Sequence, residues 1–147
     1  LDRFACVLHF GYADPQAERR VLSGEAGATR LGDLAPCMDL AAWREARNLV
    51  RQVRLSDPVL DYVERVVTRI RAEGSFCSTR AVKHWIGLAQ AEAWLGGRDF
   101  VTPDDLQATL GDAMAHRGTL DERRLNRSDR RERLGRVVAE VPVGWKP

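Results

Sequence analysis

Hydrophobic residues recur every three or four positions in four long stretches of the sequence, which is the spacing of one face of an α-helix. These stretches run from Asp39 to Val53, from Ser56 to Gly74, from Ser78 to Gly96 and from Thr102 to Gly118. Each begins at a residue that can cap a helix, and the last three end at glycine. The pattern predicts a mainly α protein, in which four helices joined by short links form a bundle.

The sequence ahead of the bundle has a different pattern. Residues 4–12, FACVLHFGY, are nearly all apolar, β-branched or aromatic, which is typical of a strand buried in a sheet. A single strand cannot satisfy its own backbone hydrogen bonds, so we expect its neighbours in sequence outside this chain, as in a fragment of something longer. Pro15 predicts the start of a short helix over 16–22, followed by a Gly- and Ala-rich connector.

Beyond Gly118 the sequence is strongly charged as far as Leu134, which predicts a solvated helix or connector. The apolar residues 137–143 before Trp145 suggest that the tail returns to dock on a surface. We therefore divide the chain into a strand region (1–13), a short helix with connector (14–37), a helical bundle (38–118) and a charged connector with a docking tail (119–147).

Composition narrows the class of protein without naming a partner. The chain has 147 residues, 44% hydrophobic and 30% charged, which suits one modest core, and its net charge of +2 is too small to predict binding to nucleic acid or to a membrane surface. Its three cysteines lack the spacing of a disulfide framework or a zinc site. No apolar run reaches the roughly 20 residues of a membrane span. We expect a cytoplasmic protein without membrane insertion.

Two arginines occupy positions that have an energetic cost. Arg80 lies in the first turn of its helix, where the helix dipole disfavours a cation unless an anion, such as a phosphate, lies nearby. The alternative is a salt bridge to a local carboxylate such as Glu73, or simple solvation. Arg3 lies at the start of the predicted strand, and ligand sites form at strand ends in α/β domains. The alternative is an ordinary polar residue beside a strand.

The histidines and tryptophans are weaker candidates for functional residues. The histidines at 9, 84 and 116 have no metal-ligand spacing, so we expect satisfied or exposed imidazoles and no metal site. The tryptophans at 43, 85 and 94 fall on the apolar faces of helices, where packing is their usual role. The sequence contains no phosphate loop of the form GxxxxGK[ST] and no other complete catalytic motif.

Several motifs in order resemble the MoxR branch of the AAA+ ATPases: LDRF at 1–4, SDPVLDYV at 56–63, STRA at 78–81, GRDFVTPDDL at 97–106 and HR at 116–117. The resemblance covers residues 1–143. It implies that 1–13 is the last strand of a truncated α/β core and that 38–118 is the helical lid. Two departures occur: Tyr12 and Pro15 are separated where the family has Tyr-Pro, and Thr79 replaces a proline.

The resemblance also implies roles for both arginines. Arg3 corresponds to an arginine finger that acts in trans on the nucleotide of a neighbouring subunit, where it stabilises charge on the transferred phosphoryl group. Arg80 corresponds to the second sensor, a nucleotide-binding residue that contacts the nucleotide of its own subunit.

For the intact protein, the resemblance implies Mg-ATP hydrolysis by a ring-shaped homo-oligomer, typically a hexamer, that remodels, matures or activates client proteins, in some cases with a von Willebrand factor A-domain partner. We expect this chain alone to be inactive and to hold neither ATP nor Mg, because it lacks the phosphate loop. The alternative is a non-enzymatic helical interaction module, for which the amphipathic helices suffice. No feature of the sequence identifies the client.

Overall fold

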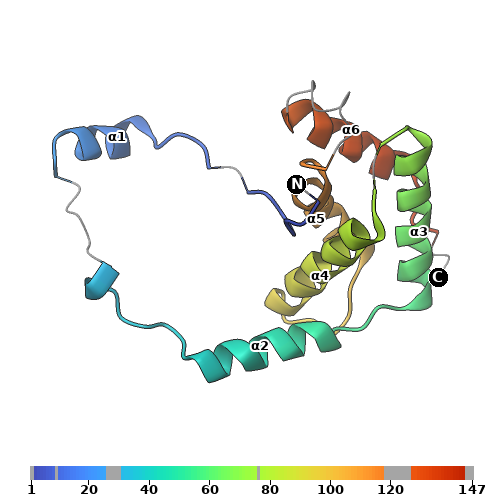
Figure 1. Ribbon diagram of the computed structural model, residues 1–147, viewed down its shortest axis with the longest axis horizontal. Coiled ribbons are helices and arrows are strands. Elements are labelled where there is room, and N and C mark those ends of the chain that lie inside the picture. Colours follow the sequence, from blue (N-terminus) through green and yellow to red (C-terminus); the bar gives the residue numbers. More distant parts are fainter. Residues whose placement is uncertain (1, 9, 26–30, 76, 118–126, 145–147) are drawn as a thin grey trace.

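The computed structural model describes residues 2–8, 10–25, 31–75, 77–117 and 127–144 (Figure 1). The expectations for His9, for a helix end at Gly118, for a connector over 119–126 and for Trp145 lie outside these residues. The described elements are α1 (Pro15–Leu22), the short 3-10 helix η1 (Leu31–Asp33), α2 (Leu40–Gln52), α3 (Asp57–Ala72), α4 (Thr79–Leu95), α5 (Pro103–Met114) and α6 (Arg127–Glu140).

The hydrophobic core lies between α3, α4, α5 and α6, so the mainly α fold class is confirmed. α4 packs along α5, while α6 contacts both α3 and α5. The largest fully buried side chains are Trp85, Tyr62, Leu106, Leu110, Val66 and Val137. None of the described helices is long and apolar enough to cross a membrane.

Local capping explains why α4 and α5 begin where the sequence predicts. Thr102 and Asp105 form a reciprocal capping box at the start of α5, and Pro103 follows the cap. Arg98 strengthens this corner, because its two terminal nitrogens each lie 2.6 Å from an oxygen of Asp105. Gly74 follows α3 with a φ of 79°, a left-handed conformation that other residues adopt at a cost.

The segment between α2 and α3 is tied to the segment between α4 and α5. The N–H of Arg54 donates to the carbonyl of Asp99 at 2.8 Å, and the N–H of Val101 donates to the carbonyl of Arg54 at 3.0 Å. These bonds form a single parallel β-bridge between Arg54 and Phe100. Buried Val53 and Val101 flank the bridge, so the two connections close one end of the core.

The structure corrects the expectation that α2 packs one face inward. Figure 1 shows α2 laid along the edge of the bundle, where it contacts α4. Leu40, Trp43 and Leu49, which fall on the predicted inward face, are exposed, and α2 has no buried residue. α2 keeps its amphipathic pattern, but only its end reaches the core, through Val53. The four-helix bundle therefore consists of α3 to α6, and α2 is an accessory to it.

The strand expected over residues 4–12 is not formed among the described residues of that segment. Residues 4–8 and 10–12 have an irregular conformation, and Phe4, Leu8, Phe10 and Tyr12 are exposed. A strand exists through its ladder of bonds to a neighbouring strand. Here the N–H of Val7 instead donates to the carbonyl of Asp112 at 3.2 Å, which joins this segment to α5. The short helix predicted after Pro15 is confirmed as α1, which lies apart from the bundle in Figure 1.

The charged C-terminal stretch forms a helix, α6, as expected, but this helix is part of the core. Val137 and Val138, near its end, and Val141, just beyond it, are buried. Its polar face is bound by ion pairs: Arg69 lies 2.6 Å from Glu140, and Arg133 lies 3.0 Å from Glu73. The prediction that the apolar residues after 136 dock on a surface is therefore confirmed for these valines.

Candidate functional site

Three side chains converge on the carboxylate of Asp2 at the start of α4. The hydroxyl of Ser78 donates to Oδ1 of Asp2 at 2.9 Å, and Nη1 of Arg117 donates to the same oxygen at 3.0 Å. Nη1 of Arg80 lies 3.4 Å from Oδ2. The partners stand at least 76 positions from Asp2 in the sequence. Asp2 thus joins the LDRF segment to the first turn of α4 and to the end of α5.

The start of α4 is well suited to an anion. Ser78 is the N-cap of the helix, and its hydroxyl oxygen accepts from the N–H of Ala81 at 3.1 Å while the hydroxyl proton is donated to Asp2. A carboxylate in this place also meets the positive end of the helix dipole. Ser78 therefore both caps the helix and donates a hydrogen bond to the carboxylate of Asp2.

Arg80 lies in the first turn of α4, as the sequence indicates, with a side chain that is 59% exposed. An anion offsets its unfavourable position in the dipole, and in this structure that anion is the carboxylate of Asp2. The alternative of a salt bridge to a carboxylate therefore holds in its general form, but the partner is Asp2 and not Glu73, which is bound by Arg69 at 3.3 Å and by Arg133 at 3.0 Å. A basic group beside an anion at a helix start is the arrangement that also holds phosphates.

The surroundings of Asp2 favour its ionised form. Burial by itself raises the pKa of this carboxyl, but the hydrogen bond from Ser78 and the charges of Arg117 and Arg80 outweigh burial, so the pKa of Asp2 lies below its usual value. Asp2 is therefore a carboxylate at neutral pH and matches the donors around it.

Arg3 follows Asp2 in a turn, and Arg3 is exposed. The structure therefore places the two predicted arginines in neighbouring segments, since Asp2 precedes Arg3 in the chain and pairs with Arg80 in space. Both guanidinium groups belong to surface residues, as contact with a nucleotide or a second subunit requires.

Arg117 was not singled out from the sequence as a site residue, although it belongs to the quoted HR motif. Its side chain is only 1% exposed, and it contacts Asp2, the carbonyl oxygens of Phe4 and Ala5, and both described histidines. Nη2 of Arg117 lies 2.8 Å from Nδ1 of His84, so this imidazole is satisfied by a neighbour, as expected. A buried arginine is recognisable only in three dimensions, because arginines are usually exposed.

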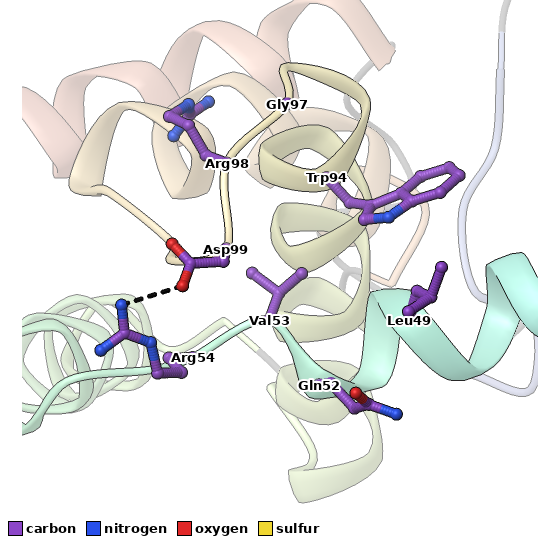
Figure 2. Close-up of a pocket in the computed structure, with 8 residues that line it drawn as sticks. All are labelled: Leu49, Gln52, Val53, Arg54, Trp94, Gly97, Arg98 and Asp99. Atoms are coloured by element: carbon purple, nitrogen blue, oxygen red, sulfur yellow. Dashed lines mark hydrogen bonds and ion pairs between the residues drawn. The ribbon is translucent and has the colours of Figure 1, made fainter.

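The packing role predicted for the tryptophans holds for Trp85 and for the partly buried Trp94, and it fails for Trp43. Trp85 is fully buried, and its ring N–H donates to the carbonyl of Leu106 at 2.8 Å. Trp43 is 54% exposed. Trp94 is half-buried and lines an open groove of about 470 Å³ at the ends of α2 and α4, shown in Figure 2. The groove also contains the exposed Arg54–Asp99 pair at 3.0 Å.

This groove and the Asp2 cluster have no residue in common. Among the described residues, the start of α4 combines a helix N-terminus with three donors around one carboxylate. The groove of Figure 2 lies at the opposite end of that helix, and its two arginines are paired with Asp99 and Asp105. The Asp2 cluster is therefore the better candidate site.

Comparison with known proteins points to one kind of domain. Residues 69–138 match the AAA lid domain family. The chain is 31% identical over 120 residues to the uncharacterised protein YeaC of Bacillus subtilis (strain 168), a match that covers 80% of this chain and 38% of YeaC. It superposes on a crystal structure of a candidate ATPase from Cytophaga hutchinsonii with a TM-score of 0.76 and 24% identity, over 96% of this chain and 47% of that one. The chain thus spans less than half the length of either relative.

Proposed function

We propose that this chain is the lid region of a MoxR-type AAA+ ATPase, together with the segment that carries the arginine finger. The match of residues 69–138 to the AAA lid domain and the shared fold with a candidate ATPase support an AAA+ lid. The observation that carries the finer assignment is the Asp2 cluster, because it brings the LDRF and STRA motifs to one place on the surface. The order of the remaining motifs agrees with the same family.

In the longer protein, the proposed activity is Mg-ATP hydrolysis by a ring-forming homo-oligomer, which uses the energy to remodel, mature or activate a client protein. ATP with Mg supplies the phosphoryl group, and this chain contributes cations to it. Exposed Arg3 extends toward a neighbouring subunit as a trans-acting finger. Arg80, at the anion-binding start of α4, contacts a phosphate in place of, or beside, the carboxylate of Asp2.

The contacts of Asp2 bear on which nucleotide Arg80 serves. The family resemblance assigns Arg80 to the nucleotide of its own subunit and Arg3 to that of a neighbour. Asp2 holds Arg80 against the segment that contains Arg3, at 3.4 Å between guanidinium and carboxylate. This shared anchorage favours a common target, so we propose that both arginines face the same nucleotide.

Substitution of each arginine tests the assignment in a protein that contains this chain and its phosphate loop. Arg3→Ala is expected to leave nucleotide binding intact and to reduce turnover by roughly 10³-fold, since a finger acts mainly on the transition state. Arg80→Ala is expected to weaken nucleotide binding or slow hydrolysis. Arg47→Ala, on an exposed position of α2, is the matched control and should retain both. Unchanged turnover in the first two variants would remove both residues from the site.

Mixed rings then decide between own-subunit and neighbour roles. Each arginine variant is combined with a variant that lacks the phosphate-loop lysine but keeps both arginines. Activity that returns on mixing means that the tested arginine acts across the subunit boundary, because an intact pocket then meets an intact neighbour. We expect rescue for both Arg3→Ala and Arg80→Ala. Rescue for Arg3→Ala alone would restore the own-subunit role of Arg80.

The competing class is a non-enzymatic helical interaction module. It requires no upstream catalytic sequence, whereas the ATPase requires a GxxxxGK[ST] loop in the same reading frame before residue 1. Reading that upstream sequence distinguishes the two classes, and its lack of a phosphate loop would favour the interaction module.

A further inference from the structure

Arg117 is a buried cation held by groups from two distant parts of the chain. Its side chain is 1% exposed, and removing such a charge from water is costly unless it is paired and hydrogen-bonded. Nη1 donates to Asp2 at 3.0 Å, while Nη2 donates to the carbonyl oxygens of Phe4 and of Ala5, the latter at 3.3 Å. Arg117 thus contacts residues 2, 4 and 5, which lie more than 110 positions earlier in the sequence.

The other side of the guanidinium is fixed by α4 and by the end of α5. Nη2 lies 2.8 Å from Nδ1 of His84, and Nε lies 3.2 Å from Nε2 of His116. Because arginine only donates hydrogen bonds, Nδ1 of His84 is the acceptor of this contact. The arginine is therefore oriented by the bundle on one side and binds residues 2–5 on the other.

Arg3 lies between the residues that Arg117 holds. Arg117 binds the side chain of Asp2 before it and the main chain of Phe4 after it, while the side chain of Arg3 remains exposed. Fixing both neighbours fixes the backbone from which the Arg3 side chain extends. Arg117 can therefore position the backbone of Arg3 without contacting the Arg3 side chain.

We propose that Arg117 is a positioning residue that clamps the Asp2–Arg3–Phe4 turn to the helical bundle, so that Arg3 and Arg80 are presented as one rigid unit. The inference rests on the proposed function, because it gives Arg117 a part in placing the arginine finger. Its consequence is that a movement of the lid carries the finger with it. The planar fork of arginine suits the clamp, since lysine presents a single nitrogen and cannot span the same acceptors.

The clamp itself is tested on this chain without any nucleotide. Cys6 is half-buried in the clamped segment, Cys37 is exposed and Cys77 is buried in the core, so the three thiols report on different regions. Arg117→Lys keeps the charge and removes the fork. We expect iodoacetamide to label Cys6 several-fold faster in this variant, measured peptide by peptide, while labelling of Cys37 and Cys77 is unchanged. An unchanged rate at Cys6 would overturn the proposal.

A second variant distinguishes loss of the clamp from general unfolding. General unfolding would also expose the buried Cys77 and make it react faster. Asp2→Asn keeps the size of the side chain, lies outside the core and weakens the same attachment from the other side. It should also release Cys6 without exposing Cys77. If Cys77 reacts faster with Arg117→Lys and neither thiol responds to Asp2→Asn, then Arg117 supports the fold alone and the clamp is wrong.

The link to Arg3 is tested in the longer protein that contains the phosphate loop. Arg117→Lys is expected to lower kcat by roughly 10²-fold with little change in KM, as a small misplacement of a catalytic group does. The Arg3→Ala/Arg117→Lys double variant should be no slower than Arg3→Ala alone, because Arg117 acts through Arg3. If the double variant instead loses the product of the two single-variant losses in kcat, Arg117 does not act through Arg3 and the positioning role is wrong. If Arg3→Ala leaves turnover unchanged while Cys6 is released, the proposed function fails and the clamp stands as a structural contact.

Discussion

The part of the chain before residue 53 and the bundle that follows it have similar amphipathic patterns and opposite outcomes. α1 and α2 contain no buried residue, whereas α3, α4 and α5 each bury one full face. Trp43 of α2 is 54% exposed and Trp85 of α4 is fully buried, although both lie on the apolar face of a helix. An amphipathic pattern therefore shows that a helix has a face suited to packing, but not that the chain supplies a partner for it.

The apolar faces of the bundle helices are buried because these helices pack against one another. α3, α4, α5 and α6 each contact at least one other bundle helix, so every apolar face meets another. α2 is linked to the bundle through the Arg54–Phe100 bridge and contacts α4, but it contains no buried residue. Its exposed apolar residues, together with those of the segment before it, form the surface least accounted for within the chain.

The largest expected effect is the loss of the buried tryptophan. Trp85→Ala removes a fully buried indole and its hydrogen bond of 2.8 Å to the carbonyl of Leu106, so we expect the free energy of unfolding to fall by about 3–5 kcal/mol. Urea unfolding followed by circular dichroism measures the loss. A decrease below about 1 kcal/mol would mean that this helix face is not the centre of the core.

An intermediate effect is expected at the start of α5. Asp105 is 4% exposed and accepts from Arg98 and from the N–H of Thr102 at 2.8 Å, so Asp105→Asn should reduce the free energy of unfolding by about 1–3 kcal/mol. Asp104→Asn, at the exposed neighbouring position, is the matched control and should change it by less than about 0.5 kcal/mol. Equal effects of the two substitutions would argue against the buried network.

The same residue gives a dependence on pH. The hydrogen bond from Arg98 lowers the pKa of Asp105, burial opposes it, and the bonds from Thr102 lower it further, so the pKa in the folded state lies below that in the unfolded state. Its contribution to stability is therefore complete above about pH 4 and is lost as the pH falls through the folded value. As the pH is lowered below about 4, the free energy of unfolding should decrease less steeply for Asp105→Asn than for the unsubstituted chain. Urea unfolding at a series of pH values measures this difference.

The smallest expected effect is at Trp43. Because its side chain is 54% exposed, Trp43→Ala should change the free energy of unfolding of this chain by less than about 0.5 kcal/mol. The measurement is the same urea titration as for Trp85→Ala, so the two tryptophans are compared directly. A loss above about 2 kcal/mol would show that α2 packs inward after all, and the contrast between the two regions would disappear.

Much of the helical part could be predicted because helix ends are local. Ser78, Thr102 and Gly74 act within a few residues of themselves, through caps and a left-handed turn, and the helices over 57–72, 79–95 and 103–114 lie close to the predicted limits. The strand predicted over 4–12 is not formed in residues 4–8 and 10–12, because a strand requires a partner, and that partner was expected outside this chain. The sequence also did not predict that α6 is part of the core, because only a few valines of this strongly charged helix are buried.

The sequence by itself determined where helices begin and end, which of their faces are apolar and which arginine stands at the start of α4, because these properties depend on neighbours along the chain. Only the tertiary structure decided that Asp2 is the anion beside Arg80, that Arg117 is buried against residues 2–5 and that Trp43 is exposed. Each of these depends on residues far apart in sequence meeting in space, and spacing along a chain carries no information about such encounters.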